Sequence, residues 1–315
     1  MKLTVDKILK NSDIRKLGYI KICKPLDLGL ESRNFLLITP SNKYVLKSYK
    51  NTLLNEVIFE TSILSHLKRF NNKFPSPIRK VFYINSLPCV LYTFIEGRGL
   101  VPHDINISTL QKVAELQALI HKNLVNFIPD GNRERFSIFD LSFVDDFRCD
   151  CSREDTLLIK NCRDWLVTRL NRFKRSNFPK SIIHEDLEME NILVDRKGDV
   201  KFIDFGESHR AEVVSDIAIT IKELIVNNYG TNTNNLIGAY LDAYEVNNPV
   251  LNVVQLKVLY TLFVRRGLFM FSYFLNKQAK NKDLFLSRRI KIERKTLKLL
   301  LLPNDLEQKI ISFKL

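Results

Sequence analysis

The chain has 315 residues and a mass of 36.8 kDa, and 45% of its residues are hydrophobic, so it can form two lobes with separate cores and is not an intrinsically disordered protein. Its net charge of +14 is compatible with an anionic small substrate, while the spread of basic residues along the chain makes a nucleic-acid partner unexpected. Neither the start of the chain nor residues 258–275, the longest apolar stretch, has the uncharged run of a signal peptide or membrane span, so we expect a cytoplasmic protein without a membrane anchor.

The first 95 residues are predicted to form a lobe with a small antiparallel sheet and one helix. Short runs of β-branched and aromatic residues, separated by turn formers, predict strands at 19–23, 35–39, 43–49, 81–84 and 90–95. Ser41 and Asn42 mark a hairpin turn. Apolar residues at helical spacing predict a helix over 53–70, which the proline-containing stretch 74–77 ends.

Helical periodicity dominates the second predicted lobe, residues 96–315. It predicts helices at 109–124, 156–173, 218–228, 236–244 and 256–274. A further helix around residues 288–299 carries basic residues interleaved with apolar ones, which indicates a solvated basic face. The fold class expected from these elements is α+β, with a strand-rich lobe followed by a larger, mainly helical one.

The stretch SIIHEDLEMENILVDRKGDVKFIDFGE, residues 181–207, concentrates carboxylates between two apolar runs that predict buried strands. It contains His184-x-Asp186, then Asn191, and after the second strand Ile203-Asp204-Phe205. Phosphoryl transfer needs Mg²⁺ held on nucleotide phosphates and a carboxylate that orients the attacking hydroxyl. Amide and carboxylate oxygens are suitable ligands for that metal. The spacing therefore favours phosphoryl transfer.

This pattern resembles the catalytic core of the aminoglycoside phosphotransferase/choline kinase family, which includes homoserine and hydroxylysine kinases and has the protein-kinase-like, bilobal fold. Its usual form is H-G-D-L-x-x-x-N, followed by I-D-F/W and by D-L/I-A at a helix start. The matching residues are His184, Asp186, Leu187, Asn191, Ile203, Asp204, Phe205, Asp216, Ile217 and Ala218.

The resemblance implies a role for each polar residue of the core. Asp186 is expected to be the catalytic residue that accepts and orients the hydroxyl proton, and Asn191 and Asp204 are expected to bind Mg²⁺. His184 is expected to orient the catalytic loop through hydrogen bonds. Asp216 is interpreted as a helix N-cap that gives structural support.

The resemblance also implies a nucleotide site for ATP or GTP in the first lobe. Lys47, on the third predicted strand, is expected to contact the phosphates and to pair with Glu60, which fits the family pattern better than Glu56 one turn earlier. The loop 29–34 resembles the phosphate-covering loop, and VLYTFIEG at 90–97 resembles the hinge that binds adenine. The residues assigned to the nucleotide in this way are Lys47, Glu60, Ser32, Asn34, Tyr92 and Phe94.

Three glutamates of the catalytic loop, Glu185, Glu188 and Glu190, are expected to face solvent. Glu185 departs from the family, which has a small residue at that position.

The late apolar stretch LKVLYTLFVRRGLFMFSYFL, residues 256–275, resembles a helix of homoserine and hydroxylysine kinases. It contains Arg265 and Arg266, which point about 100° apart on a helix, so we expect one to reach solvent and the other to face the cleft between the lobes. The cleft-facing arginine either bridges to a carboxylate of a neighbouring helix or binds a substrate carboxylate, because its planar fork suits that group. The second alternative favours an amino alcohol or a hydroxy-amino acid such as homoserine over choline or an aminoglycoside.

Other classes of protein stay open as alternatives. Asp204-Phe-Gly206 matches the metal-binding triplet of protein kinases, but only about ten residues separate it from Asp216 and no A-P-E sequence follows. A catalytically inactive nucleotide-binding or nucleic-acid-binding module is the other alternative. The sequence as a whole predicts a small-molecule kinase, monomeric or homodimeric, whose partners are a nucleoside triphosphate and a small hydroxyl substrate.

Overall fold

The computed structural model describes residues 3–26, 32–70, 72–135, 137–145, 147, 151–175, 178–231, 233–280 and 283–314. The chain forms two compact units. The first contains residues 1–98 together with two later segments, 128–133 and 201–206, and the second contains the rest. The first unit is thus assembled from three separate parts of the sequence.

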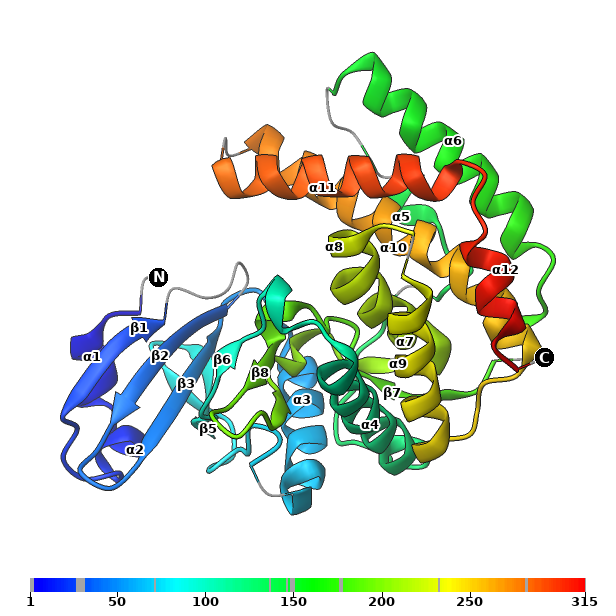
Figure 1. Ribbon diagram of the computed structural model, residues 1–315. Coiled ribbons are helices and arrows are strands. Elements are labelled where there is room, and N and C mark those ends of the chain that lie inside the picture. The colour runs from blue at the N-terminus through cyan, green and yellow to red at the C-terminus, as the bar shows by residue number, and fades with distance from the viewer. Residues whose placement is uncertain are drawn as a thin grey trace. The chain divides into compact units, whose positions relative to one another are not determined.

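The first unit is built on a five-stranded antiparallel sheet with the strand order β1-β2-β3-β5-β4 (Figure 1). Its strands are β1 (Ile22–Leu26), β2 (Ser32–Ile38), β3 (Lys43–Tyr49), β4 (Phe82–Ile84) and β5 (Leu87–Thr93). The strand at β3 has the predicted bounds, whereas β1, β2 and β5 are displaced from the predicted ranges by a few residues. The predicted hairpin joins β2 to β3, where the Thr39 amide donates to the Asn42 carbonyl.

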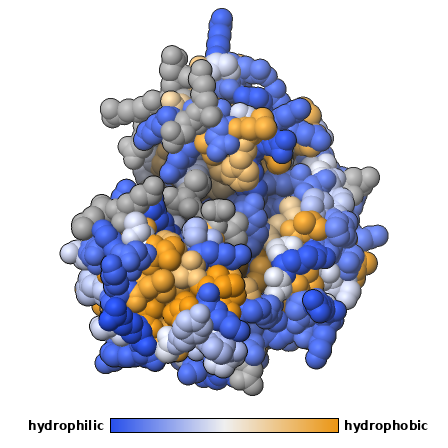
Figure 2. Space-filling view, turned by 90° about the vertical axis from the view of Figure 1, so that its left-hand side faces the viewer, coloured by the Kyte–Doolittle hydropathy of each residue, from blue (hydrophilic) through white to orange (hydrophobic). Residues whose placement is uncertain are grey.

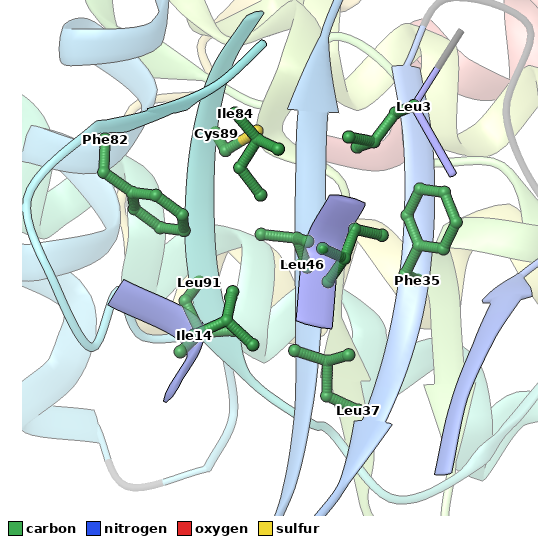
Figure 3. Packing of buried hydrophobic residues seen from close by; sticks show 10 residues of the cluster. Leu3, Ile14, Phe35, Leu37, Leu46, Phe82, Ile84, Cys89 and Leu91 are labelled. Carbon is green, nitrogen blue, oxygen red and sulfur yellow. The ribbon is translucent and has the colours of Figure 1, made fainter. Parts of the chain in front are cut away.

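Helices cover both faces of this sheet. The short helices α1 (Val5–Lys10) and α2 (Ser12–Arg15) pack on one face, where Leu3 and Ile14 meet Leu46 and its neighbours (Figure 3). Alternate residues of a strand point to opposite faces. The residue after Leu46, Lys47, therefore points to the other face, toward α3 (Leu54–Leu67). The prediction of a single helix in this lobe was wrong, because α1 and α2 also belong to it.

The second unit is mainly helical. Its helices are α4 (Ile107–Leu124), α5 (Ser142–Asp145), α6 (Arg153–Leu170), α7 (Val213–Ile221), α8 (Asn227–Tyr229), α9 (Asn234–Asn247), α10 (Val253–Lys280), α11 (Leu284–Leu301) and α12 (Leu306–Ile311). A π-helical turn, Lys222–Val226, connects α7 to α8. The strands are β7 (Lys180–Ile183), which pairs antiparallel with β10 (His209–Glu212), and β8 (Ile192–Val194). Two short strands, β6 (Arg98–Gly99) and β9 (Val200–Phe202), lie where the chain passes between the units.

Helix α10 is the central helix of the second unit. It is long and apolar enough to cross a membrane, but 89% of its apolar window is buried inside the protein, as expected for a core helix. Arg265 and Arg266 are both buried, with exposed fractions of 8% and 6%. The expectation that one of these arginines reaches solvent was therefore wrong.

The surface carries both charged and hydrophobic side chains. Helix α11 exposes Arg288, Lys291 and Lys295 while it buries Ile290 and Leu297, which agrees with the predicted basic face. Arg289 is an exception, because its side chain is only 17% exposed and pairs with Glu188. In the view of Figure 2, hydrophobic residues form patches among hydrophilic ones. Exposed apolar side chains are ordinary on protein surfaces.

Candidate active site

Lys47 is at the centre of the polar cluster in the first unit. Its Nζ lies 2.9 Å from Glu60 Oε1 on α3 and 2.9 Å from Asp204 Oδ1 in the segment 201–206. The predicted pair of Lys47 and Glu60 is thus present, and Glu60 rather than Glu56 is the partner. Lys47 and Glu60 are buried, whereas 41% of the Asp204 side chain is exposed.

The two carboxylates determine the charge of Lys47. Burial alone would lower the pKa of its ammonium group, but the charges of Asp204 and Glu60 raise that pKa well above its ordinary value. Lys47 therefore remains a cation at physiological pH. Its two partners fix this positive charge in one place beside the exposed carboxylate of Asp204.

The backbone around Asp204 has an unusual conformation. Asp204 has a φ of 60°, a left-handed value that is uncommon for a residue with a side chain and is often associated with functional sites. A Cβ atom at Gly206 would lie 3.0 Å from Asp204 Oδ1 and 3.3 Å from Lys47 Nζ. Glycine at this position therefore leaves the space in which the lysine and the aspartate meet.

The other residues predicted to bind nucleotide lie on the same sheet. Asn34 is the cross-strand neighbour of Lys47, and Ser32 is opposite Tyr49. The Tyr92 hydroxyl lies 3.0 Å from that of Tyr49, buried close to the lysine. The Phe94 amide donates to the Lys43 carbonyl over 3.3 Å, so binding of adenine by that amide would have to replace this bond. Gly29, Leu30 and Glu31 of the predicted phosphate-covering loop lie outside the described residues.

The predicted catalytic loop lies between β7 and β8 in the second unit. The Asn191 side-chain nitrogen donates to the Asp186 carbonyl (2.8 Å) and to Asp186 Oδ2 (2.9 Å). His184 is fully buried, and its Nδ1 atom accepts a hydrogen bond from the Asp186 backbone amide at 3.3 Å. Both of these side-chain hydrogen bonds of Asn191 use its amide nitrogen. Its amide oxygen is therefore the atom suited to a cation.

Asp216 supports the catalytic loop in a way that differs from the prediction. Helix α7 begins three residues before Asp216, and its N-cap is Glu212, so the interpretation of Asp216 as an N-cap was wrong. Its buried carboxylate accepts hydrogen bonds from the backbone amides of His184 (3.1 Å) and Glu185 (2.7 Å). It also forms a hydrogen bond with the Nε2 atom of His121 (2.9 Å). Burial disfavours its charge, but these donors and nearby imidazoles lower the pKa of Asp216 to about 2. Asp216 thus anchors the loop as a permanent anion.

Replacing Asp216 with alanine should destabilise the protein strongly. The change leaves two loop amides and a buried imidazole without their acceptor, and each buried polar group that loses its partner typically costs about 1–3 kcal/mol. Urea unfolding would measure the effect. Asp242→Ala, which removes an exposed carboxylate on α9, is the control, and equal stability of the two variants would contradict the anchoring role.

Glu188 does not face solvent, contrary to the prediction. Arg266 Nη2 contacts Glu188 Oε1 at 3.1 Å and Asp186 Oδ1 at 3.2 Å, and Arg289 Nη2 contacts Glu188 Oε2 at 2.8 Å. Burial, with a contribution from Glu223, raises the pKa of Glu188 to about 7. Arg266 therefore pairs with two carboxylates of the catalytic loop and bridges them. Of the two alternatives given above for the cleft-facing arginine, this is the one in which its partner is a carboxylate of the protein and not of a substrate. Glu190, in contrast, is exposed as expected.

The bridge continues into a buried ionic network. Glu223, at the π-helical turn, accepts from Arg266 Nε at 3.4 Å and from Lys222 Nζ at 3.0 Å, and Lys222 also pairs with Glu293 of α11 at 2.5 Å. Although burial opposes its charge, Lys222 and Arg266 lower the pKa of Glu223 to about 2. The position of Asp186 is thus linked to α11 through side chains that are nearly or fully buried.

Glu185 adopts a φ of 67°, a left-handed value that glycine adopts more readily than a residue with a side chain. Its Oε2 atom is buried, and burial raises the pKa of the carboxyl to about 7. The expectation that Glu185 faces solvent was therefore wrong for this oxygen atom. The loop nevertheless keeps its hydrogen bonds to Asp216.

Arg265 has surroundings quite unlike those of Arg266. Its Nη2 atom donates to the backbone carbonyls of Ser137 (2.9 Å) and Asp140 (3.1 Å), and its guanidinium lies over the Phe143 ring. Among the described residues, no carboxylate lies within ion-pairing distance, and Nε has no hydrogen-bond partner. Burial lowers the pKa of Arg265 accordingly.

The donor types available for a divalent cation fit Mg²⁺. In the described part of the chain, no three His, Cys, Asp or Glu side chains form a ready metal-binding group. Mg²⁺ in nucleotide-dependent enzymes is commonly held by one or two protein oxygens, with phosphate oxygens and water completing its shell. Asn191 of the second unit offers an amide oxygen of this kind, and Asp204 of the first unit offers a carboxylate.

Comparison with known proteins identifies the relatives of this chain. The phosphotransferase enzyme family matches residues 22–254. Homoserine kinase of Methylobacillus glycogenes is 20% identical over 261 residues, which cover 74% of this chain and 73% of that enzyme. Two solved structures share the fold: an amicoumacin kinase in complex with AMP-PNP, Ca²⁺ and Ami (TM-score 0.74, 14% identity, 96% of this chain and 98% of that one), and a microcompartment-associated aminopropanol kinase (TM-score 0.71, 15% identity, 93% and 94%).

These comparisons confirm the predicted α+β, protein-kinase-like fold. The family match covers well over half of the sequence and includes Lys47, Glu60, Asp186, Asn191 and Asp204. The chain therefore belongs to the phosphotransferase enzyme family, as a small-molecule kinase.

Proposed function

We propose that the protein transfers the terminal phosphoryl group of ATP or GTP to a hydroxyl group of a small molecule in a Mg²⁺-dependent reaction. The observation that carries this proposal is the position of the Lys47 ammonium, 2.9 Å from both Glu60 and Asp204. A buried, fixed cation next to an exposed carboxylate suits the binding of phosphates together with a divalent metal.

Each residue of the site has a defined task in this proposal. Lys47 binds phosphate oxygens and stabilises the charge that develops on them, while Asn191 and Asp204 hold Mg²⁺, which neutralises phosphate charge when bound. Asp186 orients the substrate hydroxyl and accepts its proton. Arg266 and Asn191 each contact one oxygen of the Asp186 carboxylate, so they fix the direction in which it presents its lone pairs.

The proposed substrate is an amino alcohol or a hydroxy-amino acid such as homoserine. Similarity to a homoserine kinase and to an aminopropanol kinase supports this class. Arg265 supports the hydroxy-amino acid over the amino alcohol. Its buried guanidinium has no carboxylate partner among the described residues and can bind a substrate carboxylate. The similarity to an amicoumacin kinase keeps antibiotic substrates, along with choline, as the alternative.

The test of the function is a panel of hydroxyl-bearing metabolites with coupled detection of ADP or GDP. Homoserine, aminopropanol, choline, ethanolamine and an aminoglycoside would each be offered with ATP or GTP at several Mg²⁺ concentrations. We expect one of the first two to be phosphorylated. Nucleotide binding without phosphorylation of any compound would instead favour the inactive-module alternative.

Arg265→Met tests the charge of the substrate. If Arg265 binds a carboxylate, the variant should raise KM by about tenfold to a hundredfold for carboxylate-bearing substrates and leave KM for neutral or cationic alcohols unchanged. Arg294→Met, which removes an arginine paired with Asp155 on another helix, is the control for lost stability. Unchanged kinetics with a lower Tm would assign Arg265 to the scaffold.

A further inference from the structure

The segment 128–133 belongs to the first unit, although residues 99–127 separate it in sequence from the main part of that unit, residues 1–98. Its backbone packs closely on α3. Gly131 has a φ of 72°, and a Cβ atom there would lie 2.3 Å from the Asn55 carbonyl oxygen and 3.0 Å from the Phe59 nitrogen. The Asp130 amide also donates to Ser62 Oγ over 3.0 Å. These contacts hold the segment against the helix that carries Glu60.

The side chain of Arg133 connects this segment to two parts of the nucleotide side of the site. Its Nη1 atom donates to the Phe205 carbonyl at 3.2 Å, and its Nη2 atom donates to the Glu56 carbonyl at 3.2 Å. Its nitrogens also lie 3.8 Å from Glu56 Oε1 and 3.9 Å from Glu60 Oε2. The residue is 5% exposed. One buried guanidinium thus contacts the residue after Asp204, the backbone of α3, and the second oxygen of the carboxylate that binds Lys47.

We propose that Arg133 is a positioning residue that fixes the Asp204-Phe205-Gly206 segment to α3 and thereby sets the geometry of Lys47, Glu60 and Asp204. A planar guanidinium can donate in two directions at once, toward the Phe205 carbonyl and toward the Glu56 carbonyl, which a lysine ammonium cannot reproduce with the same reach. The contacts of Arg133 are with the protein itself. Its effect on substrate turnover passes through Asp204 and Glu60.

The first measurement does not depend on activity. Hydrogen–deuterium exchange of the unliganded Arg133→Met variant should be faster than wild type in two regions, residues 203–206 and the first half of α3, because both lose a bond to the guanidinium. Arg294→Met is a matched control, since Arg294 also pairs with a carboxylate (Asp155, 2.7 Å) and lies near a phenylalanine ring (Phe271, 5.7 Å). We expect its exchange to change only around α6 and α11.

The second measurement rests on the proposed function. Arg133→Met should lower kcat by about tenfold or more while KM for the hydroxyl substrate stays within about twofold, since the change misplaces Asp204 but not the acceptor. Arg133→Lys, which keeps the charge, should have a kcat between those of wild type and Arg133→Met. If the methionine variant does not fold, the same measurements are made on the lysine variant.

The outcomes separate the two proposals. Faster exchange at residues 203–206 supports the positioning role even if no phosphorylation is found, in which case only the proposed function fails. Unchanged exchange in both regions, or a loss of Tm like that of Arg294→Met with unchanged kcat, would overturn the positioning role and leave Arg133 as a scaffold residue.

Discussion

Replacing Asp204 with alanine is expected to abolish measurable turnover, a loss of about a thousandfold or more. The change removes the exposed carboxylate proposed to bind Mg²⁺ and one of the two anions that hold Lys47 at 2.9 Å. Both consequences weaken the stabilisation of phosphate charge. Steady-state turnover on the identified substrate, measured across a range of Mg²⁺ concentrations, would test the expectation.

Asp199→Ala is a suitable control for this change, because Asp199 is an exposed aspartate in the turn before β9. We expect that variant to keep wild-type kinetics. Substantial activity in Asp204→Ala at saturating Mg²⁺ would refute the assignment of Asp204 as a metal ligand and would leave it as a partner of Lys47 alone.

The second large effect is expected from Asp186→Asn. An amide can keep the shape of the side chain but cannot accept a proton, so kcat should fall by about 10² to 10⁴. Nucleotide affinity should change little, because the residue acts on the hydroxyl. Single-turnover kinetics together with calorimetric titration of the nucleotide would separate the two quantities.

Glu190→Gln provides the matched comparison for Asp186→Asn. It makes the same carboxylate-to-amide change on an exposed position of the same loop, so we expect nearly wild-type kcat. If both variants turned over at similar rates, Asp186 would not be the catalytic residue.

The sequence predicted best the parts of the molecule whose contacts are local. The hairpin that ends in β3 has turn residues and alternating side chains within a few positions of each other, and Lys47 was placed on it correctly. The spacing of His184, Asp186 and Asn191 likewise reflects hydrogen bonds within one loop. In contrast, α1 and α2 have six and four residues, too few to show a helical period.

The parts that could not be predicted depend on partners far away in the sequence. Glu188 resembles an ordinary loop carboxylate until Arg266 and Arg289, from α10 and α11, are placed beside it. Arg133 lies in a stretch without a recognisable motif, and its importance is visible only once residues 201–206 and α3 meet around it. Asp216 was found by its motif, but its role depended on where α7 begins.

The discontinuity of the first unit has a consequence for how the protein folds during its synthesis. Residues 1–98 can form the sheet and α3 early, but the segments 128–133 and 201–206 that complete the unit are made only later. Until then Lys47 has Glu60 but not Asp204, and the packing surface of α3 that receives Gly131 stays uncovered. Because domains generally form as units while the chain emerges, the N-terminal part should wait in an incomplete state until most of the central sequence has been translated. A truncated chain ending at Arg98 should accordingly be incompletely folded, because it lacks the two later segments of the first unit.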